Sequence, residues 1–312
     1  MNFRTRASAL LTGVTLLAAL TGCATTSNAD NAAAGPEKLV FAQIPSESAQ
    51  GISDDNQAII QVIERETGLE VEMQQVTDYA AVIEGLRAGQ IDLAGMGPFS
   101  YMVAKDGGAG VEALGALVDA PDEKPGYQSF GIVPADSDIT DLGGFKGKNV
   151  CFVDPTSTSG FLYPSAGLLK LGIDPNSDLT PTFAGGHDAS ALSVADGTCE
   201  AGFAYDTMVT TELIDSGSLK EGDVKVVWES DTIAGSPYVA SDQLPADLIA
   251  KLKGIFANDL NVPALVKSGV CSSDADCGLP EDSAYGFIPV EDSLYDGVRA
   301  VCEVTEAAAC KI

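Results

Sequence analysis

Apolar and polar positions alternate along this 312-residue chain with two periods, one typical of strands and one typical of helices. Strands are expected at 38–43, 69–73, 91–95, 114–118, 149–153, 200–204 and 224–229, and near Thr182. Helices are expected at 54–67 between Ser53 and Gly68, at 79–86 after Asp78, and at 160–171, 189–195, 207–216, 245–260 and 262–268. Regular alternation of strand and helix predicts an α/β fold with mostly parallel sheets.

A hydroxyl-rich turn separates the strand at 149–153 from the helix that follows it. The turn reads Asp154-Pro-Thr-Ser-Thr-Ser-Gly160, so Ser157, Thr158 and Ser159 lie at or near a helix N-terminus. Backbone N–H groups there lack intrahelical partners, and the positive end of the helix dipole favours anions. Ordinary helix capping by serine or threonine is the alternative interpretation of the same residues.

A second turn, Gly185-Gly-His-Asp-Ala-Ser190, carries His187, the single histidine of the sequence. It also comes just before an expected helix, at 189–195. A lone histidine is often structural, but two successive strand–turn–helix units with donors at their turns argue for more than capping. Together they predict an oxyanion site made of neutral donors and one imidazole.

The first residues have the pattern of an export leader. Arg4 and Arg6 form a charged start, and the apolar run 7–20 is too short to span a bilayer comfortably. Leu20-Thr-Gly-Cys23 looks like a bacterial lipobox, which predicts a signal peptide over 1–22, lipidation of Cys23 and a flexible tether over 23–36. The alternative is an ordinary signal peptide with an incidental cysteine. Since no later segment approaches about 18 uninterrupted apolar residues, we expect an extracytoplasmic protein, lipid-anchored to the outer face of the cell membrane.

Acidic residues outnumber basic ones, 45 against 17, which gives a formal net charge of −28 at pH 7. Loss of Arg4 and Arg6 with the leader leaves 15 basic residues and a charge of −30. Such a chain repels nucleic acid and bulk anions alike. A bound anion must therefore be held by short-range, pre-aimed dipoles in a closed cleft of low dielectric.

Six cysteines follow Cys23, and an even number in an exported chain suggests three disulfides whose pairing the sequence leaves open. Their clustering along the chain favours Cys151–Cys199, Cys271–Cys277 and Cys302–Cys310. A metal site is the alternative. It is disfavoured because Cys271 and Cys277 lack the spacing of a zinc knuckle, and because His187 is far from both in sequence.

The two turns and several other segments closely resemble the phosphate/phosphite/phosphonate-binding proteins of ABC importers, the PhnD-like family. The resemblance extends from about Leu39 to Val301, and the segments that carry it are 77–86, 97–101, 126–129, 152–164, 172–175, 185–197 and 287–290, together with Tyr295. It implies the type II periplasmic-binding-protein fold, in which two α/β lobes enclose a cleft. Lobe 1 would comprise 37–131 and 238–312, lobe 2 would comprise 132–237, and crossovers would lie near 131–134 and 236–239.

The resemblance also implies the ligand contacts. The Ser157–Ser159 turn and His187 would donate hydrogen bonds to phosphoryl oxygens, the imidazole more strongly if it is protonated beside a dianion. Tyr79 and Tyr127 would reach the ligand from lobe 1, although Tyr79 could equally be a core residue, and Tyr101 is expected to pack. Asp206 would face the amine of an aminoalkylphosphonate or a protonated ligand oxygen, and a plain helix cap is the alternative.

The leading function is therefore a solute-binding lipoprotein, without cofactor or metal, that delivers a phosphonate, phosphite or phosphate to an ABC permease as a monomer. One rival is an exported hydrolase of phosphate or other esters, with Ser157 or Ser159 as nucleophile and His187 as base. Against it, no Gly-x-Ser-x-Gly elbow is present, and Asp188 adjoins His187 in sequence, where it is poorly placed to orient the ring. A binding protein for another small anion, such as a sulfonate, is the second rival.

Overall fold

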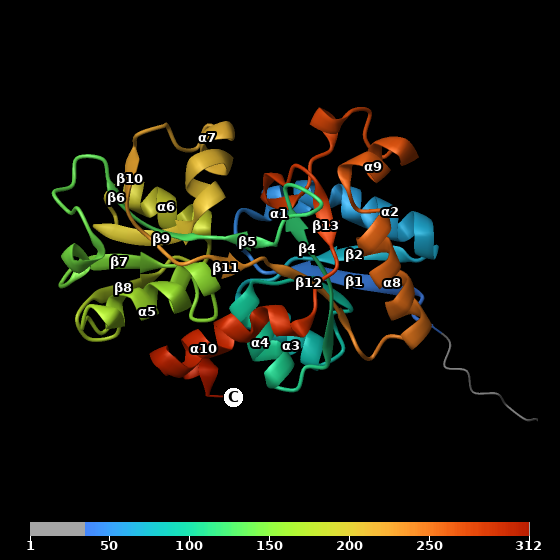
Figure 1. The fold of residues 1–312 in the computed structure, drawn as a ribbon, viewed down its shortest axis with the longest axis horizontal. Helices are drawn as coiled ribbons and strands as arrows, with labels where there is room; N and C mark the ends of the chain where they lie inside the picture. Colours follow the sequence, from blue (N-terminus) through green and yellow to red (C-terminus); the bar gives the residue numbers. More distant parts are fainter. Residues whose placement is uncertain (1–34, 312) are drawn as a thin grey trace, which may run out of the picture. The chain divides into compact units, whose positions relative to one another are not determined.

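The computed structural model describes residues 35–311, which form two mixed β-sheets covered by helices (Figure 1). The first sheet has the strand order β13-β4-β12-β3-β1-β2, and the second has the order β10-β6-β9-β7-β8. The predicted signal peptide, Cys23 and the tether up to residue 34 lie outside the described residues. Within 35–311, no helix combines the length and the apolar character needed to cross a membrane.

The strands of the first sheet are β1 (Lys38–Gln43), β2 (Glu70–Gln74), β3 (Leu93–Gly95), β4 (Val111–Val118), β12 (Pro237–Ser241) and β13 (Gly286–Ile288). Those of the second sheet are β6 (Ser129–Pro134), β7 (Asn149–Phe152), β8 (Thr180–Phe183), β9 (Ala201–Tyr205) and β10 (Val224–Glu229). Between the sheets, β5 (Gly126–Tyr127) and β11 (Ile233–Ala234) form a short antiparallel ribbon, which Figure 1 shows linking the two halves.

The α-helices are α1 (Ala49–Asp55), α2 (Gln57–Thr67), α3 (Tyr79–Arg87), α4 (Pro98–Asp106), α5 (Tyr163–Lys170), α6 (His187–Ala195), α7 (Leu213–Asp215), α8 (Ala246–Asn258), α9 (Val262–Ser268) and α10 (Asp296–Thr305). The helices expected at 160–171 and 207–216 each begin with a π-helical turn, η2 (Thr158–Leu162) and η3 (Met208–Glu212). The short 3₁₀ turns are η1 (Leu142–Phe145), η4 (Asp274–Asp276), η5 (Pro280–Asp282), η6 (Asp292–Tyr295) and η7 (Ala308–Cys310).

The α/β class is confirmed, but the sheets are mixed where mostly parallel ones were expected. β1 pairs in parallel with β2 and β3, and β7 pairs in parallel with β8 and β9. In contrast, β12 runs antiparallel to β3 and β4, and β6 runs antiparallel to β9 and β10. Parallel neighbours need a helix-sized crossover, whereas the chain enters β6 and β12 directly from the ribbon.

Capping residues set several of the helix ends, with side-chain N-caps at α1, α3 and α9. The Asp78 carboxylate accepts a hydrogen bond from the Ala81 N–H at 2.8 Å, and Gly68 ends α2 with a φ of 75°, as predicted. The single helix expected at 54–67 with Ser53 as cap is wrong, because the chain breaks it at Asn56 and Ser48 caps α1.

The break follows from the buried side chain of Asn56. Its amide donates to the Gln43 Oε1 at 2.7 Å and to the Ile52 carbonyl at 2.8 Å, and its Oδ1 accepts from the Tyr238 hydroxyl at 3.1 Å. An asparagine that bonds in this way competes with the regular helical backbone. α1 and α2 are therefore separate helices.

The C-terminal helix α10 packs against both halves of the fold. It contacts α4 beside the first sheet and α5 beside the second, and Figure 1 shows it lying between them. Phe99, Leu162 and Val298 from α4, η2 and α10 share one apolar cluster there. The lobe limits expected from the resemblance stay a prediction, although β6 lies wholly in the second sheet and β12 wholly in the first.

The three favoured disulfide pairings are all present. Cys151 and Cys199 join β7 to the segment before β9, with their Cα atoms 5.8 Å apart, and both side chains are buried. The other two pairs are Cys271–Cys277 and Cys302–Cys310. The last pair ties the C-terminal turn η7 to α10.

Replacing both Cys151 and Cys199 with alanine should lower the free energy of unfolding by about 4 kcal/mol, because the bridge closes a loop of 48 residues. The same change at Cys271 and Cys277 opens a loop of only 6 residues and should cost about 2 kcal/mol. Urea unfolding of both double variants measures the difference. A larger loss at the short loop would contradict this ranking.

Candidate functional site

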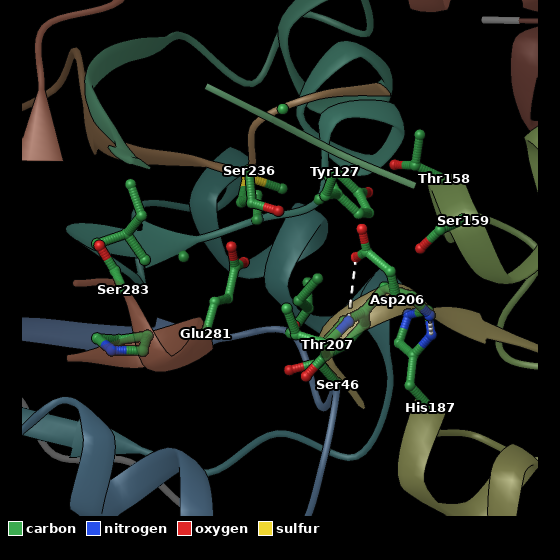
Figure 2. A pocket seen from close by; sticks show the side chains of 18 of the residues that line it. Ser46, Tyr127, Thr158, Ser159, His187, Asp206, Thr207, Ser236, Glu281 and Ser283 are labelled. Carbon is green, nitrogen blue, oxygen red and sulfur yellow. Dashed lines mark hydrogen bonds between the residues drawn. The ribbon is translucent and has the colours of Figure 1, made fainter. Parts of the chain in front are cut away.

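A pocket between elements of the two sheets brings the predicted site residues together. Its lining includes Tyr79, Tyr127, Ser157, Thr158, Ser159, His187 and Asp206. In the view of Figure 2, Thr158, Ser159 and His187 lie on one side, with Glu281 and Ser283 on the other. The structure thus collects side chains from widely separated segments, while their contact with a ligand stays a prediction.

The turn from β7 into η2 forms one end of the pocket. Ser157 is the N-cap of this π-helical turn, and the Leu162 N–H reaches back five residues to the Ser157 carbonyl at 3.0 Å. The backbone N–H groups of Thr158 and Ser159 donate no hydrogen bond within the described part of the chain. A Cβ at Gly160 would overlap the Val153 side chain, so glycine is needed for the turn to lie this close to its strand.

The hydroxyls of this turn are oriented by backbone donors. Ser157 Oγ accepts from the Gly160 N–H at 3.0 Å. Thr158 Oγ1 accepts from the Phe99 N–H at 2.8 Å, a bond that links η2 to α4 beside the other sheet. Because each oxygen accepts from a backbone N–H, each hydroxyl proton is available to a ligand. Both side chains are buried, so these donors are shielded from bulk water.

Two tyrosine hydroxyls adjoin the same turn. Tyr79, the first residue of α3, is buried, and its hydroxyl has no hydrogen-bond partner among the described residues. Burial raises the pKa of Tyr79, and the nearby Ser157 hydroxyl offsets part of the rise. Burial also raises the pKa of Tyr127, and Ser159 and Thr158 offset it in part. Both phenols are therefore neutral donors.

His187 is a neutral donor as well. Its Nδ1 accepts from the Tyr205 N–H at 3.2 Å, which leaves the proton of the neutral ring on Nε2. That Nε2 lies 3.4 Å from Ser157 Oγ. Burial lowers the pKa of His187 to about 3, so the ring carries no charge at neutral pH before a ligand binds.

Asp206 presents a fixed carboxylate to the pocket. Its Oδ2 accepts from the Gln128 N–H at 3.0 Å, and its Oδ1 accepts from the Thr207 N–H at 3.1 Å, the bond drawn in Figure 2. Burial raises the pKa of this carboxyl. Its bonds go to the residue between β5 and β6 and to the next residue in the chain, and its side chain does not cap η3.

Positive charge is nearly absent from the pocket. Among the lining residues of the described chain, the exposed Lys124 is the single lysine or arginine. In residues 35–311, no group of three histidine, cysteine, aspartate or glutamate side chains could hold a metal ion. The site therefore offers hydroxyl, amide and imidazole donors to an anion, with carboxylates beside them.

A family model and two relatives of known name identify the family. Residues 41–261 match the family described as "ABC transporter, phosphonate, periplasmic substrate-binding protein". The chain is 48% identical to the phosphate-import protein PhnD of Mycolicibacterium smegmatis over 284 residues, 88% of each chain. It is 33% identical to the phosphonates-binding periplasmic protein of Escherichia coli, over 70% of this chain and 65% of the relative.

The chain belongs to this family.

Two solved structures extend the comparison to the fold. A binding protein component of an ABC phosphonate transporter from Pseudomonas aeruginosa superposes with a TM-score of 0.74 at 26% identity, over 88% of this chain and 87% of that one. PhnD1 from Prochlorococcus marinus, solved with methylphosphonate, gives a TM-score of 0.72 at 18% identity, over 87% and 99% of the two chains. The predicted type II periplasmic-binding-protein fold is thereby confirmed.

Because it belongs to this family, the chain is an extracytoplasmic substrate-binding protein of an ABC importer for phosphonate or phosphate. Its relatives are binding proteins and not enzymes. The chemistry of the site agrees. A hydrolytic base would need an unprotonated Nε2 facing Ser157, but the Tyr205 N–H occupies Nδ1 and leaves the proton on Nε2. The Nε2–H of His187 therefore faces Ser157 Oγ as a hydrogen-bond donor, and the ring in this tautomer cannot take the hydroxyl proton of Ser157.

Several contributors to the site could not be found from the sequence pattern. Tyr205 holds His187 through its backbone N–H and packs edge-on against the ring, and Phe99 holds Thr158 through its own N–H. Backbone donors carry no residue signature, so no pattern could assign them. Tyr101 packs as expected, against Tyr295, and its hydroxyl bonds to Asp292 at 2.8 Å.

Tyr79→Phe should separate binding from stability. The variant should be as stable as the parent without ligand, because the deleted hydroxyl has no partner in the described structure. It should bind a phosphorus oxyanion about tenfold or more weakly, because one charge-assisted hydrogen bond is lost. Thermal unfolding and isothermal titration calorimetry check the two expectations.

Tyr101→Phe is the matched control. It removes a bonded hydroxyl that does not line the pocket, so it should reduce stability and leave affinity unchanged. Equal affinities of the parent and Tyr79→Phe for the oxyanion would show that the Tyr79 hydroxyl does not bind the ligand.

Proposed function

We propose that this chain captures phosphate in the pocket between the two sheets and releases it to an ABC permease. The observation that carries the proposal is the convergence of uncharged donors at the Ser157–Ser159 turn. Ser157 and Thr158 accept from backbone N–H groups and can donate their hydroxyl protons, and His187 presents Nε2–H. The Tyr79 hydroxyl has no hydrogen-bond partner within residues 35–311. A tetrahedral oxyanion supplies acceptors for all of them.

The choice of phosphate is supported by the relatives and by Asp206. The relative that is 48% identical is named a phosphate-import protein, whereas the one named for phosphonates is 33% identical. Asp206 can accept a hydrogen bond from a protonated phosphate oxygen. Sulfate and sulfonates carry no such proton at neutral pH, so the same carboxylate disfavours them.

The ligand is tested by isothermal titration with phosphate, phosphite, methylphosphonate, 2-aminoethylphosphonate and methanesulfonate. We expect phosphate to bind at least about tenfold more tightly than methanesulfonate, a difference of about 1.4 kcal/mol. Asp206→Asn should weaken phosphate binding, because the carboxylate that accepts the ligand proton is lost. It should also reduce the ratio of phosphate affinity to methanesulfonate affinity, because the amide does not repel an unprotonated oxygen. Asp136→Asn, at an exposed loop residue outside the pocket, is the control. It should change neither the phosphate affinity nor the ratio of phosphate affinity to methanesulfonate affinity.

Tighter binding of 2-aminoethylphosphonate than of phosphate would overturn the ligand choice and assign Asp206 to the amine. Binding of methanesulfonate alone would overturn the phosphorus class.

We also propose that each sheet is the core of one lobe, with 37–128 and 237–312 in lobe 1 and 129–236 in lobe 2. These limits differ from the expected ones by one to three residues, so that all of β6 stays with the second sheet and all of β12 with the first. The β5–β11 ribbon is a natural hinge, because the chain passes between the sheets there and pairs over only two residues in each strand. Hinge bending would let ligand reach donors that are buried in this structure. The closed monomer would then present both lobes to the permease.

Attachment by a lipid on Cys23 is proposed from the lipobox-like sequence alone. In a bacterial host, the protein should fractionate with membranes, and mass spectrometry should find acyl chains on an N-terminal Cys23. Cys23→Ala should move the protein to the soluble extracytoplasmic fraction without changing phosphate affinity. Parent protein whose mature N-terminus carries no acyl chain on Cys23 would rule out this anchor.

A further inference from the structure

Five carboxylates lie on segments at one edge of the pocket, which we call the seam, and two of them, Glu47 and Glu281, line the pocket together with the anion donors. Glu47 and Asp55 come from the segment after β1 and from α1, and Glu281 and Asp282 from the turn η5. Glu212, at the end of η3 beside the second sheet, lies opposite, and η3 contacts η5. We call these five residues the cleft carboxylates. None of them has an ion-pair partner among the described residues.

Glu212 is fixed in position by two hydroxyls of its own side. Its carboxylate accepts from the Tyr205 hydroxyl and from Thr207 Oγ1, the latter at 2.9 Å. Tyr205 also orients His187 through its backbone N–H and packs against that ring, so one residue connects Glu212 with the anion donors. It cannot turn away from the seam without breaking both bonds.

The seam is crossed by a backbone bond next to Glu47. The His187 N–H donates to the Ser46 carbonyl at 2.7 Å, from α6 beside the second sheet to the segment after β1. This bond places Glu47, the next residue, against the second side of the pocket. Glu47 is therefore near enough to Glu212 and Asp188 for their charges to act on it.

The groups that face the cleft carboxylates are predominantly acidic or neutral. Their titratable neighbours are Asp54, Asp119, Asp188, Asp206, Asp215, Tyr205 and Tyr238. The cation of the pocket lining in the described chain is Lys124, which is exposed. Negative charge from the two sides thus meets with little compensation when the pocket is closed.

Loss of solvent and mutual repulsion shift these groups towards the protonated form. Burial raises the pKa of Glu47 to about 9, with Asp55 and Glu212 adding to it, and raises the pKa of Asp55 to about 6. Burial raises the pKa of Glu212 to about 7, and the charges of Asp282 and Asp55 add to the effect. Burial of its carboxyl raises the pKa of Glu281 as well, and Glu212 adds to it.

We propose that the cleft carboxylates form a proton-linked latch, so that closing the pocket over its ligand takes up protons and a rise in pH favours opening and release. The proposal rests on the proposed function, because it assumes that ligand binding closes the two sides. It concerns groups that do not contact the oxyanion at the Ser157–Ser159 turn.

The direction and size of the effect follow from Glu212. With the sides apart, its pKa should return towards 4.5, and in the closed pocket it is about 7. Below pH 4.5, Glu212 is protonated in both the open and the closed pocket, and its charge adds no free-energy cost to closing. Between pH 4.5 and about pH 7, the free-energy cost of closing grows, because Glu212 is ionised in the open pocket and has to take up a proton on closing. Above about pH 7 this cost is constant. Because Glu212 is partly exposed, we expect affinity to fall about threefold to tenfold from pH 6 to pH 8 through this group.

The test is phosphate affinity at about pH 6, 7 and 8, measured by calorimetry for the parent, Glu212→Gln and Glu303→Gln. Glutamine keeps an acceptor for Tyr205 but cannot carry charge. The Glu212 variant should bind about threefold or more tightly than the parent at pH 8, and its affinity should change less with pH. Glu303→Gln, on an exposed position of α10, should behave as the parent.

Comparing variants with one ligand cancels the protonation of phosphate itself. An identical pH dependence in parent and Glu212→Gln, or weaker binding of that variant at pH 8, would overturn the latch. Asp282→Asn, exposed on the opposite side of the seam, provides a second variant with the same expectation if Glu212→Gln does not fold.

A ligand-free measurement keeps this test separate from the proposed function. Small-angle scattering should give a smaller radius of gyration for the parent at pH 6 than at pH 8, and little change for Glu212→Gln. Absence of phosphate binding at any pH would contradict the proposed function, and scattering would then decide the latch. Radii independent of pH in the parent would contradict the latch.

Discussion

The structure is organised around one electrostatic constraint: an anion has to be held by a chain whose formal charge is −28, with almost no positive charge at the site. Long-range attraction is unavailable, so the binding energy has to come from dipoles that act over hydrogen-bond distances. Such dipoles work only when they are aimed in advance and shielded from water. The burial of Ser157, Thr158, Ser159 and His187 meets both conditions.

The fold meets the constraint by using backbone N–H groups to orient side-chain donors. The Gly160 N–H orients Ser157, the Phe99 N–H orients Thr158, and the Tyr205 N–H sets the tautomer of His187. One of these bonds, to Thr158, comes from a helix beside the other sheet. In the function that we propose, the donor set is complete only when the two sides of the pocket are together, and ligand capture is coupled to closure.

Much of this could be read from the sequence because the decisive signals are local. The turn at 154–160 and the segment at 185–190 lie between a strand and a helix, and their hydroxyls and imidazole are visible as residue types. The disulfide pairs could be favoured because their cysteines cluster along the chain. The type II fold followed from the resemblance of both turns to one family.

The remaining features depend on contacts between distant segments. The break at Asn56 follows from its bonds to Gln43 and Tyr238. Both partners lie outside the segment 54–67, so the apolar pattern of that segment could not indicate the break. Antiparallel pairing of β12 depends on how the chain re-enters the first sheet. The contact between η3 and η5, which brings the segments of Glu212 and Glu281 together, likewise has no local signature, because each residue looks like an ordinary surface carboxylate.

The central claim, that uncharged and pre-aimed donors hold the ligand, is tested most directly by the salt dependence of phosphate affinity. Dissociation constants would be measured from about 20 to about 500 mM sodium gluconate at constant pH. The account predicts an affinity that is constant or rises slightly, because salt screens the repulsion between an acidic protein and an anion and there is little attraction to screen. A tenfold or greater loss of affinity across this range would show that cationic side chains hold the ligand, and would contradict the account.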